Sequence, residues 1–180
     1  MADPAVEKAL DALIRDVPDW PETGVTFRDI TPMLADPAGL RTVIDGLTDL
    51  GRTLAAGPID RVVGIEARGF ILAVPVALAL GAGFVPVRKA GKLPAETHAV
   101  SYDLEYGSAT LELHTDALAP GDRVLVIDDV LATGGTVAAT NELISRSGAA
   151  HVGTAVLLEL ANLRGRDRIG ETPFGALRIV

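Results

Sequence analysis

The chain lacks cysteine altogether and is poor in aromatic residues, which make up 4% of its 180 positions. Without cysteine, neither disulfide bonds nor thiolate chemistry can contribute. The apolar stretch 69–82 is too short to span a bilayer and is expected to form a buried helix. The first residues carry acids early and have no apolar h-region, so they do not look like a signal peptide. A soluble, cytoplasmic protein without a membrane partner is therefore expected.

The chain is also short of positive charge: 16 Lys and Arg stand against 24 Asp and Glu, for a net charge of −8. Nucleic-acid binding generally needs a basic face, so we expect no nucleic-acid partner. A small anionic ligand is still compatible, because a few local cations outweigh a distant negative surface. The 48% of hydrophobic residues can fill a sizeable core, and no stretch resembles a linker. One domain covering residues 1–180 is expected.

The N-terminal part has one clear helical pattern at each end. Apolar residues at helical spacing predict a helix over residues 2–15. Residues 20–34 are punctuated by proline and glycine and are interpreted mostly as loop. Asp36 is expected to cap a helix that has Pro37 at its first position and runs toward Leu54.

The remainder alternates between strand and helix patterns. Strands are expected at residues 61–66, 84–89, 123–129 and 151–160, helices at 69–80 and 133–148, and a hairpin over 101–107 and 109–114. This order indicates an α/β fold whose parallel sheet has helices on both faces. Ligands of such sheets bind at the carboxyl ends of the strands. Asp128, Asp129 and the turn 66–68 should therefore lie along one edge of the sheet.

The sequence VLVIDDVLATGGT, residues 124–136, carries the clearest chemistry. Residues 133–136 open a helix, and the free N–H groups of a helix N-terminus attract phosphate. Thr136 stands where a P-loop would have lysine, which argues against a Walker-type NTPase. Two neighbouring aspartates would repel a lone phosphate, but they suit a sugar phosphate. Their carboxylates can bind the hydroxyls of the sugar or a divalent cation that accompanies it. The alternative is an acidic pair that only caps the next helix.

The same stretch resembles the phosphoribosyl-pyrophosphate (PRPP) binding motif of the type I phosphoribosyltransferases. From about Trp20 to about Arg166 the chain is similar, more narrowly, to the adenine branch of that family. The matching stretches are GVTFRDIT (24–31), VGIEARGF (63–70), FVPVRKAGKLP (84–94), SYDLEYG (101–107) and LEL-N-LRGR (158–166). The PRPP motif at residues 124–136 is shared by many transferases, whereas its combination with these stretches is specific to the adenine branch.

The resemblance implies a central parallel sheet flanked by helices, with a flap hairpin at about residues 90–115 and an N-terminal hood at about 1–35. It implies transfer of 5-phosphoribose from PRPP to N9 of adenine, giving AMP and pyrophosphate in purine salvage. Mg²⁺ would be carried by PRPP rather than held directly by protein ligands, and the enzyme would be a homodimer. It also implies a non-proline cis peptide bond within residues 66–68, between Glu66 and Ala67.

The resemblance assigns each part of the substrates to a group of residues. The 5-phosphate is assigned to Ala132, Thr133, Gly134, Gly135 and Thr136, the ribose to Asp128 and Asp129, the pyrophosphate to Arg68, Arg88, Lys89 and Lys92, the adenine to Val25, Phe27 and Arg28, and acid–base catalysis to Glu105. Phe27 would stack on the purine, while Asp29 is expected to cap or pair locally. Taken alone, the pattern of residues favours a solvent-exposed hairpin face for Glu105.

Two other functions remain open at this stage. The first is a phosphoribosyltransferase for another purine, such as xanthine or hypoxanthine. The second is a non-catalytic regulator that senses PRPP. A regulator of that kind usually carries a DNA-binding domain, for which this acidic chain has no residues left.

Overall fold

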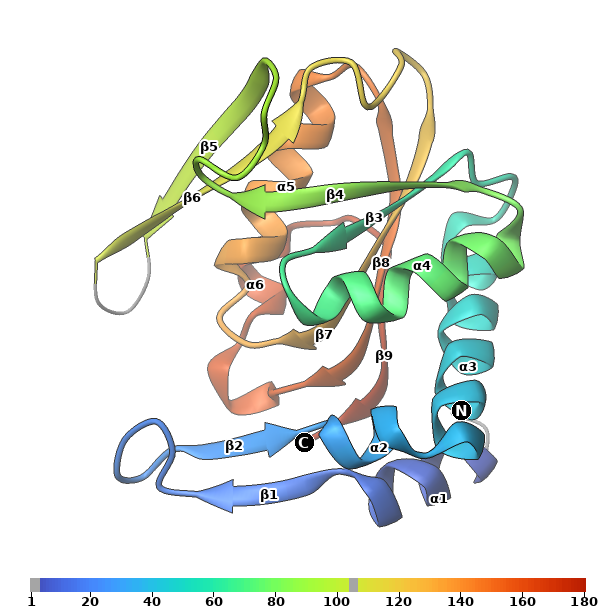
Figure 1. Ribbon diagram of the computed structural model, residues 1–180, viewed down its shortest axis with the longest axis vertical. Coiled ribbons are helices and arrows are strands. Elements are labelled where there is room, and N and C mark those ends of the chain that lie inside the picture. Colours follow the sequence, from blue (N-terminus) through green and yellow to red (C-terminus); the bar gives the residue numbers. More distant parts are fainter. Residues whose placement is uncertain (1–3, 104–106) are drawn as a thin grey trace. The chain divides into compact units, whose positions relative to one another are not determined.

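The computed structural model describes residues 4–103 and 107–180 and is drawn in Figure 1. The chain divides into two compact units, residues 1–46 and 47–180. Helix α3, Pro37–Ala55, crosses the boundary between them. None of the described helices has the length and apolar character needed to cross a membrane.

The first unit contains two helices and a two-stranded sheet before α3. Helix α1 spans Pro4–Leu13 and α2 spans Thr31–Ala35, while β1, Arg15–Pro18, pairs antiparallel with β2, Thr26–Asp29. As expected, Asp36 caps α3: its carboxylate accepts a hydrogen bond from the Gly39 N–H at 2.6 Å.

The interpretation of residues 20–34 as mostly loop was wrong for β2 and α2. Strand β2 is stabilised by pairing with β1, including ion pairs from Arg15 to Asp29, at 2.5 Å, and from Arg28 to Asp16. This pairing joins residues 8 to 14 positions apart, so the local pattern of prolines and glycines does not indicate it. Asp29 pairs and caps locally, as expected, because its carboxylate also accepts the Thr31 N–H at 2.9 Å.

The second unit is built on a seven-stranded sheet in the order β5-β6-β4-β3-β7-β8-β9. Its strands are β3 (Arg61–Ile65), β4 (Gly83–Lys89), β5 (Thr97–Asp103), β6 (Ser108–His114), β7 (Arg123–Leu131), β8 (Ala150–Glu159) and β9 (Phe174–Ile179). Strands β4, β3, β7, β8 and β9 are neighbours in the sheet and run parallel to one another. The β5–β6 hairpin is antiparallel, and its strand β6 pairs antiparallel with β4. The expected α/β fold is confirmed, with β9 as a strand that the sequence did not indicate.

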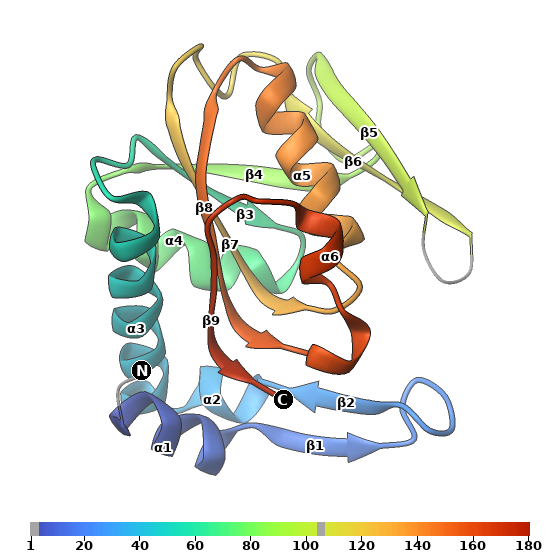
Figure 2. The same cartoon turned by 180° about the vertical axis from the view of Figure 1, so that it is seen from behind.

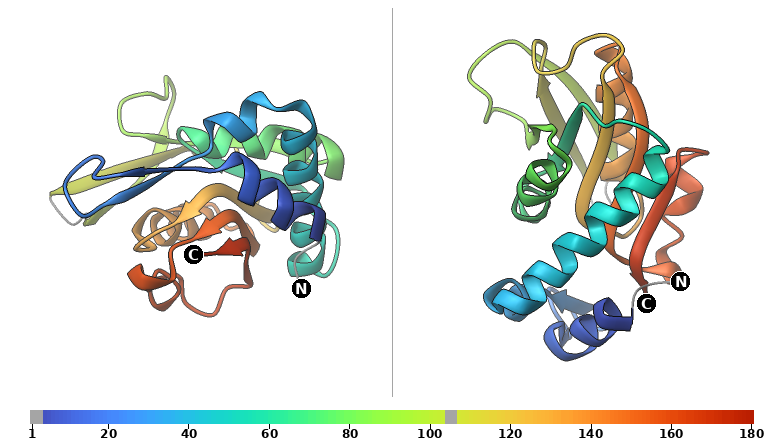
Figure 3. Two further views of the ribbon diagram at one scale, coloured as in Figure 1. Left: turned by 90° about the horizontal axis from the view of Figure 1, so that it is seen from below. Right: turned by 90° about the vertical axis from the view of Figure 1, so that its right-hand side faces the viewer.

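Two long helices cover the sheet from opposite sides (Figures 2 and 3). Helix α4, Arg68–Leu80, packs on β3 and β7, and α5, Gly135–Arg146, packs on β5. Leu143 and Ile144 of α5 share a buried cluster with Val63 and Val126 of the central strands. The short helices η1, Ala161–Leu163, and α6, Arg166–Ile169, connect β8 to β9.

The sheet sets the position of the site. Strands β3 and β7 are neighbours and run in the same direction, with Gly64 in register with Ile127. The turn after β3 and the loop after β7 therefore emerge at the same edge. Both strands are almost fully buried, which fixes the polar residues at their ends against the core.

Candidate active site

The loop between β7 and α5, residues 132–136, is called the phosphate loop below. Gly134 precedes the helix with φ of 82°, a left-handed conformation that favours glycine. Helix α5 begins at Gly135, two residues later than the sequence suggested. The first N–H groups of a helix have no carbonyl partner within it, so this loop offers donors to an anion.

The two aspartates at the end of β7 are both buried, with exposed fractions of 8% for Asp128 and 6% for Asp129. The Asp129 N–H donates to the Asp128 carboxylate at 2.9 Å, and the Arg68 guanidinium lies 2.8 Å from the Asp129 carboxylate. Burial raises the pKa of Asp128 well above its ordinary value, and the charge of Asp129 adds to that rise. Burial also raises the pKa of Asp129, against the opposing effect of Arg68. The Arg68 guanidinium therefore offsets part of the repulsion between this pair and a neighbouring phosphate.

The turn between β3 and α4 approaches the end of β7 closely. The peptide bond between Glu66 and Ala67 is cis, as the family resemblance implied. A Cβ atom on Gly69 would lie 2.8 Å from Oδ1 of Asp128 and 3.0 Å from the carbonyl oxygen of Ile127. Glycine at position 69 thus lets the start of α4 pack against the acid pair.

Glu66 organises the cationic side of the site. Its carboxylate forms an ion pair with Lys92, accepts the Lys89 N–H at 3.0 Å and lies 3.5 Å from Nε of Arg88. Burial acts to raise the pKa of Glu66, but the hydrogen bonds from Lys92 and the Lys89 N–H outweigh it and leave the pKa lowered. Glu66 is therefore charged at neutral pH and holds the segment after β4 in place.

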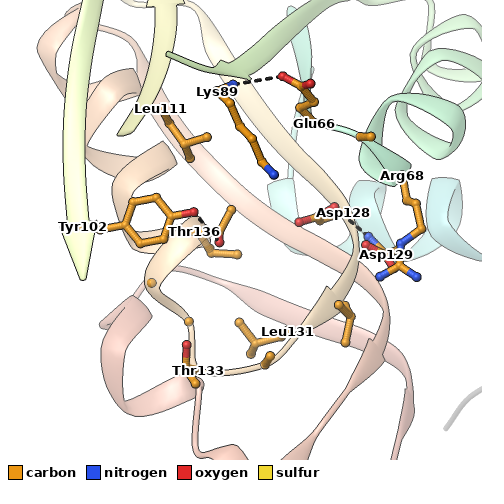
Figure 4. Close-up of a pocket in the computed structure, with 16 residues that line it drawn as sticks. Glu66, Arg68, Lys89, Tyr102, Leu111, Asp128, Asp129, Leu131, Thr133 and Thr136 are labelled. Carbon is orange, nitrogen blue, oxygen red and sulfur yellow. Dashed lines mark hydrogen bonds and ion pairs between the residues drawn. The ribbon is translucent and has the colours of Figure 1, made fainter. Parts of the chain in front are cut away.

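A cavity of about 360 Å³ lies between these elements, and Figure 4 shows its side chains. It is lined by Glu66, Ala67, Arg68, Lys89, Tyr102, Leu111 and residues 128–137. The Lys89 side chain points into it, and the Tyr102 hydroxyl lies 3.1 Å from Oγ1 of Thr136. Hydrogen-bond donors thus occupy two sides of the cavity, with the buried carboxylates between them. This arrangement suits a ligand with two anionic ends and a polar centre.

The cavity brings together most residues that the sequence assigned to PRPP. All five residues of the phosphate loop line it, as do both aspartates, Arg68 and Lys89. Arg88 and Lys92 are not among its lining residues; Arg88 donates to the carbonyl of Lys92 at 3.1 Å, and both contact Glu66.

The residues assigned to adenine belong to the first unit. Val25 is 39% exposed, Phe27 stacks edge-on against Trp20 with ring centroids 4.5 Å apart, and the Arg28 side chain pairs with Asp16. Their assignment to adenine stays a prediction. Glu105 lies outside the described residues, and its role also stays a prediction.

Sequence reasoning gave no role to Glu66 or Tyr102. For Glu66 a signal was present, because an acid ends a buried strand at the same edge as Asp128. For Tyr102 none was, because its contact with Thr136 joins residues 34 positions apart.

Comparison with known proteins agrees with this geometry. The family model for the phosphoribosyl transferase domain matches residues 30–174. The chain is 57% identical over 175 residues to an adenine phosphoribosyltransferase of Thermobifida fusca, covering 97% of this chain and 98% of the relative. It is also 57% identical to one from a Nocardioides species, covering 98% and 96% of the two chains.

Solved structures give the same result. The crystal structure of adenine phosphoribosyltransferase from Rhodothermus marinus matches with a TM-score of 0.90 and 51% identity over 98% of both chains. The enzyme from Saccharomyces cerevisiae, solved with an imino-altritol bisphosphate and adenine, matches with a TM-score of 0.91 and 37% identity, covering 96% and 98% of the two chains. The chain belongs to the type I phosphoribosyltransferase family, within its adenine phosphoribosyltransferase branch.

Proposed function

We propose that the chain transfers 5-phosphoribose from PRPP to N9 of adenine, releasing pyrophosphate and forming AMP. The observation that carries this proposal is the cavity itself. It has the phosphate loop on one side, the Glu66–Arg68 turn on another, and the buried aspartates between them. PRPP has the matching order of groups: a 5-phosphate, a ribose with two hydroxyls, and a pyrophosphate.

The phosphate loop binds the 5-phosphate through the N–H groups of Thr133, Gly134, Gly135 and Thr136 and through the threonine hydroxyls. Ala132 contributes backbone to the same loop. Left-handed Gly134 turns the chain sharply just before α5, which supports this role. Asp128 and Asp129 accept hydrogen bonds from the ribose hydroxyls. Their burial supports this role, because a hydrogen bond to a charged group is strong where water is excluded.

Mg²⁺ is the proposed cofactor and enters with PRPP. The residues fit an ion carried in this way, because the carboxylates of Asp128 and Asp129 line the cavity and favour a nearby divalent cation. When bound, the ion would neutralise charge on the pyrophosphate. Among the described residues, no group of three or more His, Asp or Glu side chains has the geometry of a metal site.

The pyrophosphate is bound by cationic side chains. Lys89 and Arg68 line the cavity, and Arg88 and Lys92 lie next to it on Glu66. The bond from C1 of ribose to pyrophosphate breaks early, so positive charge develops on the ribose and negative charge on the leaving group. Catalysis is then mainly positioning and stabilisation of that leaving group.

Adenine binds through Phe27, which stacks on the purine, and through backbone groups near Val25 and Arg28. An acceptor opposite position 6 favours an amino group over an oxo group. Glu105 takes the N9 proton as the bond to C1 forms. Glu105→Gln is expected to lower kcat by about 10²–10⁴-fold while PRPP affinity is nearly unchanged, measured under conditions in which chemistry limits turnover.

Residues 1–180 act as one phosphoribosyltransferase domain with a hood at about 1–35 and a flap at about 90–115. The β5–β6 hairpin falls within the flap range. We further propose a cytoplasmic homodimer. Ile71, Val74 and Leu78, spaced along one face of α4, are 48%, 40% and 78% exposed and support a contact with a second copy.

A panel of four bases tests the function. Adenine, hypoxanthine, guanine and xanthine are each mixed with PRPP and Mg²⁺, and nucleotide formation is followed. Efficient turnover of adenine alone is expected. Comparable turnover of hypoxanthine would instead support the transferase for another purine. Binding of PRPP without turnover of any base would support a PRPP-sensing regulator.

A further inference from the structure

Gly165, in the connection between η1 and α6, packs its backbone directly against the phosphate loop. A Cβ atom on Gly165 would overlap the carbonyl oxygen of Ala132 and lie 3.1 Å from the nitrogen of Gly134. It would also lie 2.9 Å from Cγ of Leu131. Most of these atoms belong to backbone, which cannot move aside as a flexible side chain would.

The contact is reciprocal. A Cβ atom on Gly134 would overlap the carbonyl oxygen of Gly165 and lie 3.1 Å from Cβ of Arg168. Gly134 needs glycine for its left-handed conformation as well, whereas Gly165 has φ of −58°, which any residue adopts. Glycine at position 165 is therefore explained by space alone.

The segment that carries Gly165 is fixed to the sheet by its neighbour, Arg166. The Arg166 guanidinium donates two hydrogen bonds of 2.6 Å to the Glu159 carboxylate and lies 4.7 Å from the centre of the Phe174 ring. Glu159 is 5% exposed and ends β8 in register with Leu131 of β7. Figure 2 shows α6 beside α5 on this side of the sheet. The loop and the segment behind it are thus held to adjacent strands.

We propose that Gly165 is a positioning residue for the 5-phosphate. It supports the phosphate loop from behind and holds the loop's N–H groups at the spacing that a phosphate needs. This inference rests on the proposed function, which assigns the 5-phosphate to this loop. Donors that bind or stabilise charge act only at well-defined distances, so a small outward shift of the loop would weaken binding strongly.

The test compares Gly165→Ala with wild type for two ligands, by calorimetry. Ribose 5-phosphate probes the phosphate loop, and pyrophosphate probes the Glu66–Arg68 side of the cavity. The variant is expected to bind ribose 5-phosphate roughly 10–100-fold more weakly and pyrophosphate with unchanged affinity. Gly153→Ala is the matched control, because its Cβ would lie 2.9 Å from Cβ of Leu54 and its position does not line the cavity. It should leave both affinities unchanged.

A second pair of variants keeps the inference testable if Gly165→Ala does not fold. Arg166→Gln removes the bidentate contact with Glu159 and should selectively weaken ribose 5-phosphate binding, with partial recovery in Arg166→Lys. If wild type binds ribose 5-phosphate and these variants bind it equally well, or if they lose both ligands equally, Gly165 has no positioning role. If wild type itself fails to bind ribose 5-phosphate, the assignment of the loop, and with it the proposed function, is wrong.

Discussion

At the scale of single residues, the site places two buried carboxylates beside the N–H groups at the start of α5. The Asp128 carboxylate accepts a hydrogen bond from the Asp129 N–H, and the Asp129 carboxylate forms an ion pair with Arg68. The positive charge of Arg68, 2.8 Å from the Asp129 carboxylate, offsets part of the negative charge that the pair presents to an incoming anion. The two groups titrate as a pair, so a change at one changes the charge of the other.

The first prediction concerns Asp129. Asp129→Asn should weaken PRPP binding by about 1.5–3 kcal/mol, because an amide replaces a charged acceptor for a ribose hydroxyl. This corresponds to roughly 10–150-fold in Kd, measured by calorimetry with PRPP and Mg²⁺. Asp116→Asn, at an exposed position outside the cavity lining, is the control. Normal PRPP binding with only a lower Tm would make Asp129 a structural residue.

The second prediction concerns the pH dependence of stability at His151. Burial lowers its pKa from 6.5 to about 4, partly opposed by the hydrogen bond to the Gly153 carbonyl, and its Nδ1 is buried without a partner among the described residues. The unfolded chain binds a proton at His151 below pH 6.5, whereas the folded chain does not until about pH 4. This residue's contribution to stability is therefore present above pH 6.5 and is lost as the pH falls toward 4.

His151→Gln should remove that share of the pH dependence, about 1–3 kcal/mol between pH 7 and pH 4.5. The measurement is the free energy of unfolding by urea for both proteins at several pH values. The difference between wild type and variant should shrink as the pH falls. Two parallel profiles would show that His151 titrates alike in the folded and unfolded chains.

At the scale of elements, the hairpin β5–β6 reaches the phosphate loop through one side chain. The Tyr102 ring would lie 3.0 Å from a Cβ on Gly135, and its hydroxyl lies 3.1 Å from Oγ1 of Thr136. Strand β5 is thus linked to the start of α5. A hairpin that moves as a flap would change this contact.

The third prediction follows from that link. Tyr102→Phe should raise the KM for PRPP about 2–10-fold, because one hydrogen bond worth about 0.5–1.5 kcal/mol no longer orients the Thr136 hydroxyl. The KM for adenine should stay the same. Ser101→Ala is the control on the same strand, since the Ser101 hydroxyl forms a hydrogen bond with the Thr110 hydroxyl, at 2.8 Å, within the hairpin. Equal KM values for PRPP in wild type and Tyr102→Phe would mean that the contact is incidental.

Elements whose own apolar residues are enough to bury them could be predicted from the sequence. Strand β7 and helix α4 each contain a long apolar run and were placed within a few residues of their observed bounds. Strands β1 and β9 were not predicted, because each is stabilised by a partner elsewhere in the sequence. Strand β1 pairs with β2, and β9 pairs with β8. The same holds within the site. The glycine loop and the aspartates form one motif, whereas Glu66, Tyr102 and Gly165 act through contacts with other segments.

At the scale of the whole molecule, the exposed apolar side chains on α4 are the basis of the proposed homodimer. Leu78 is 78% exposed, and Val74 and Ile71 lie one and two turns before it on the same face. Apolar side chains repeated along a helix face can meet the same face of a second copy across a twofold axis, which buries both. Because α4 begins at Arg68, such a contact would also bear on the side of the cavity that Arg68 lines.

The last prediction tests this assembly. Leu78→Glu should convert a homodimer into a monomer, because the contact would place two buried carboxylates close together without partners. Light scattering after size exclusion should give twice 18.7 kDa for wild type and 18.7 kDa for the variant. Leu163→Glu, at a 41% exposed leucine outside α4, is the matched control and should remain a dimer. A wild-type monomer would exclude the homodimer, and a dimeric Leu78→Glu would place the interface on another surface. If the variant is monomeric and its KM for PRPP rises while its far-UV spectrum is unchanged, the contact through α4 also supports the Arg68 side of the cavity.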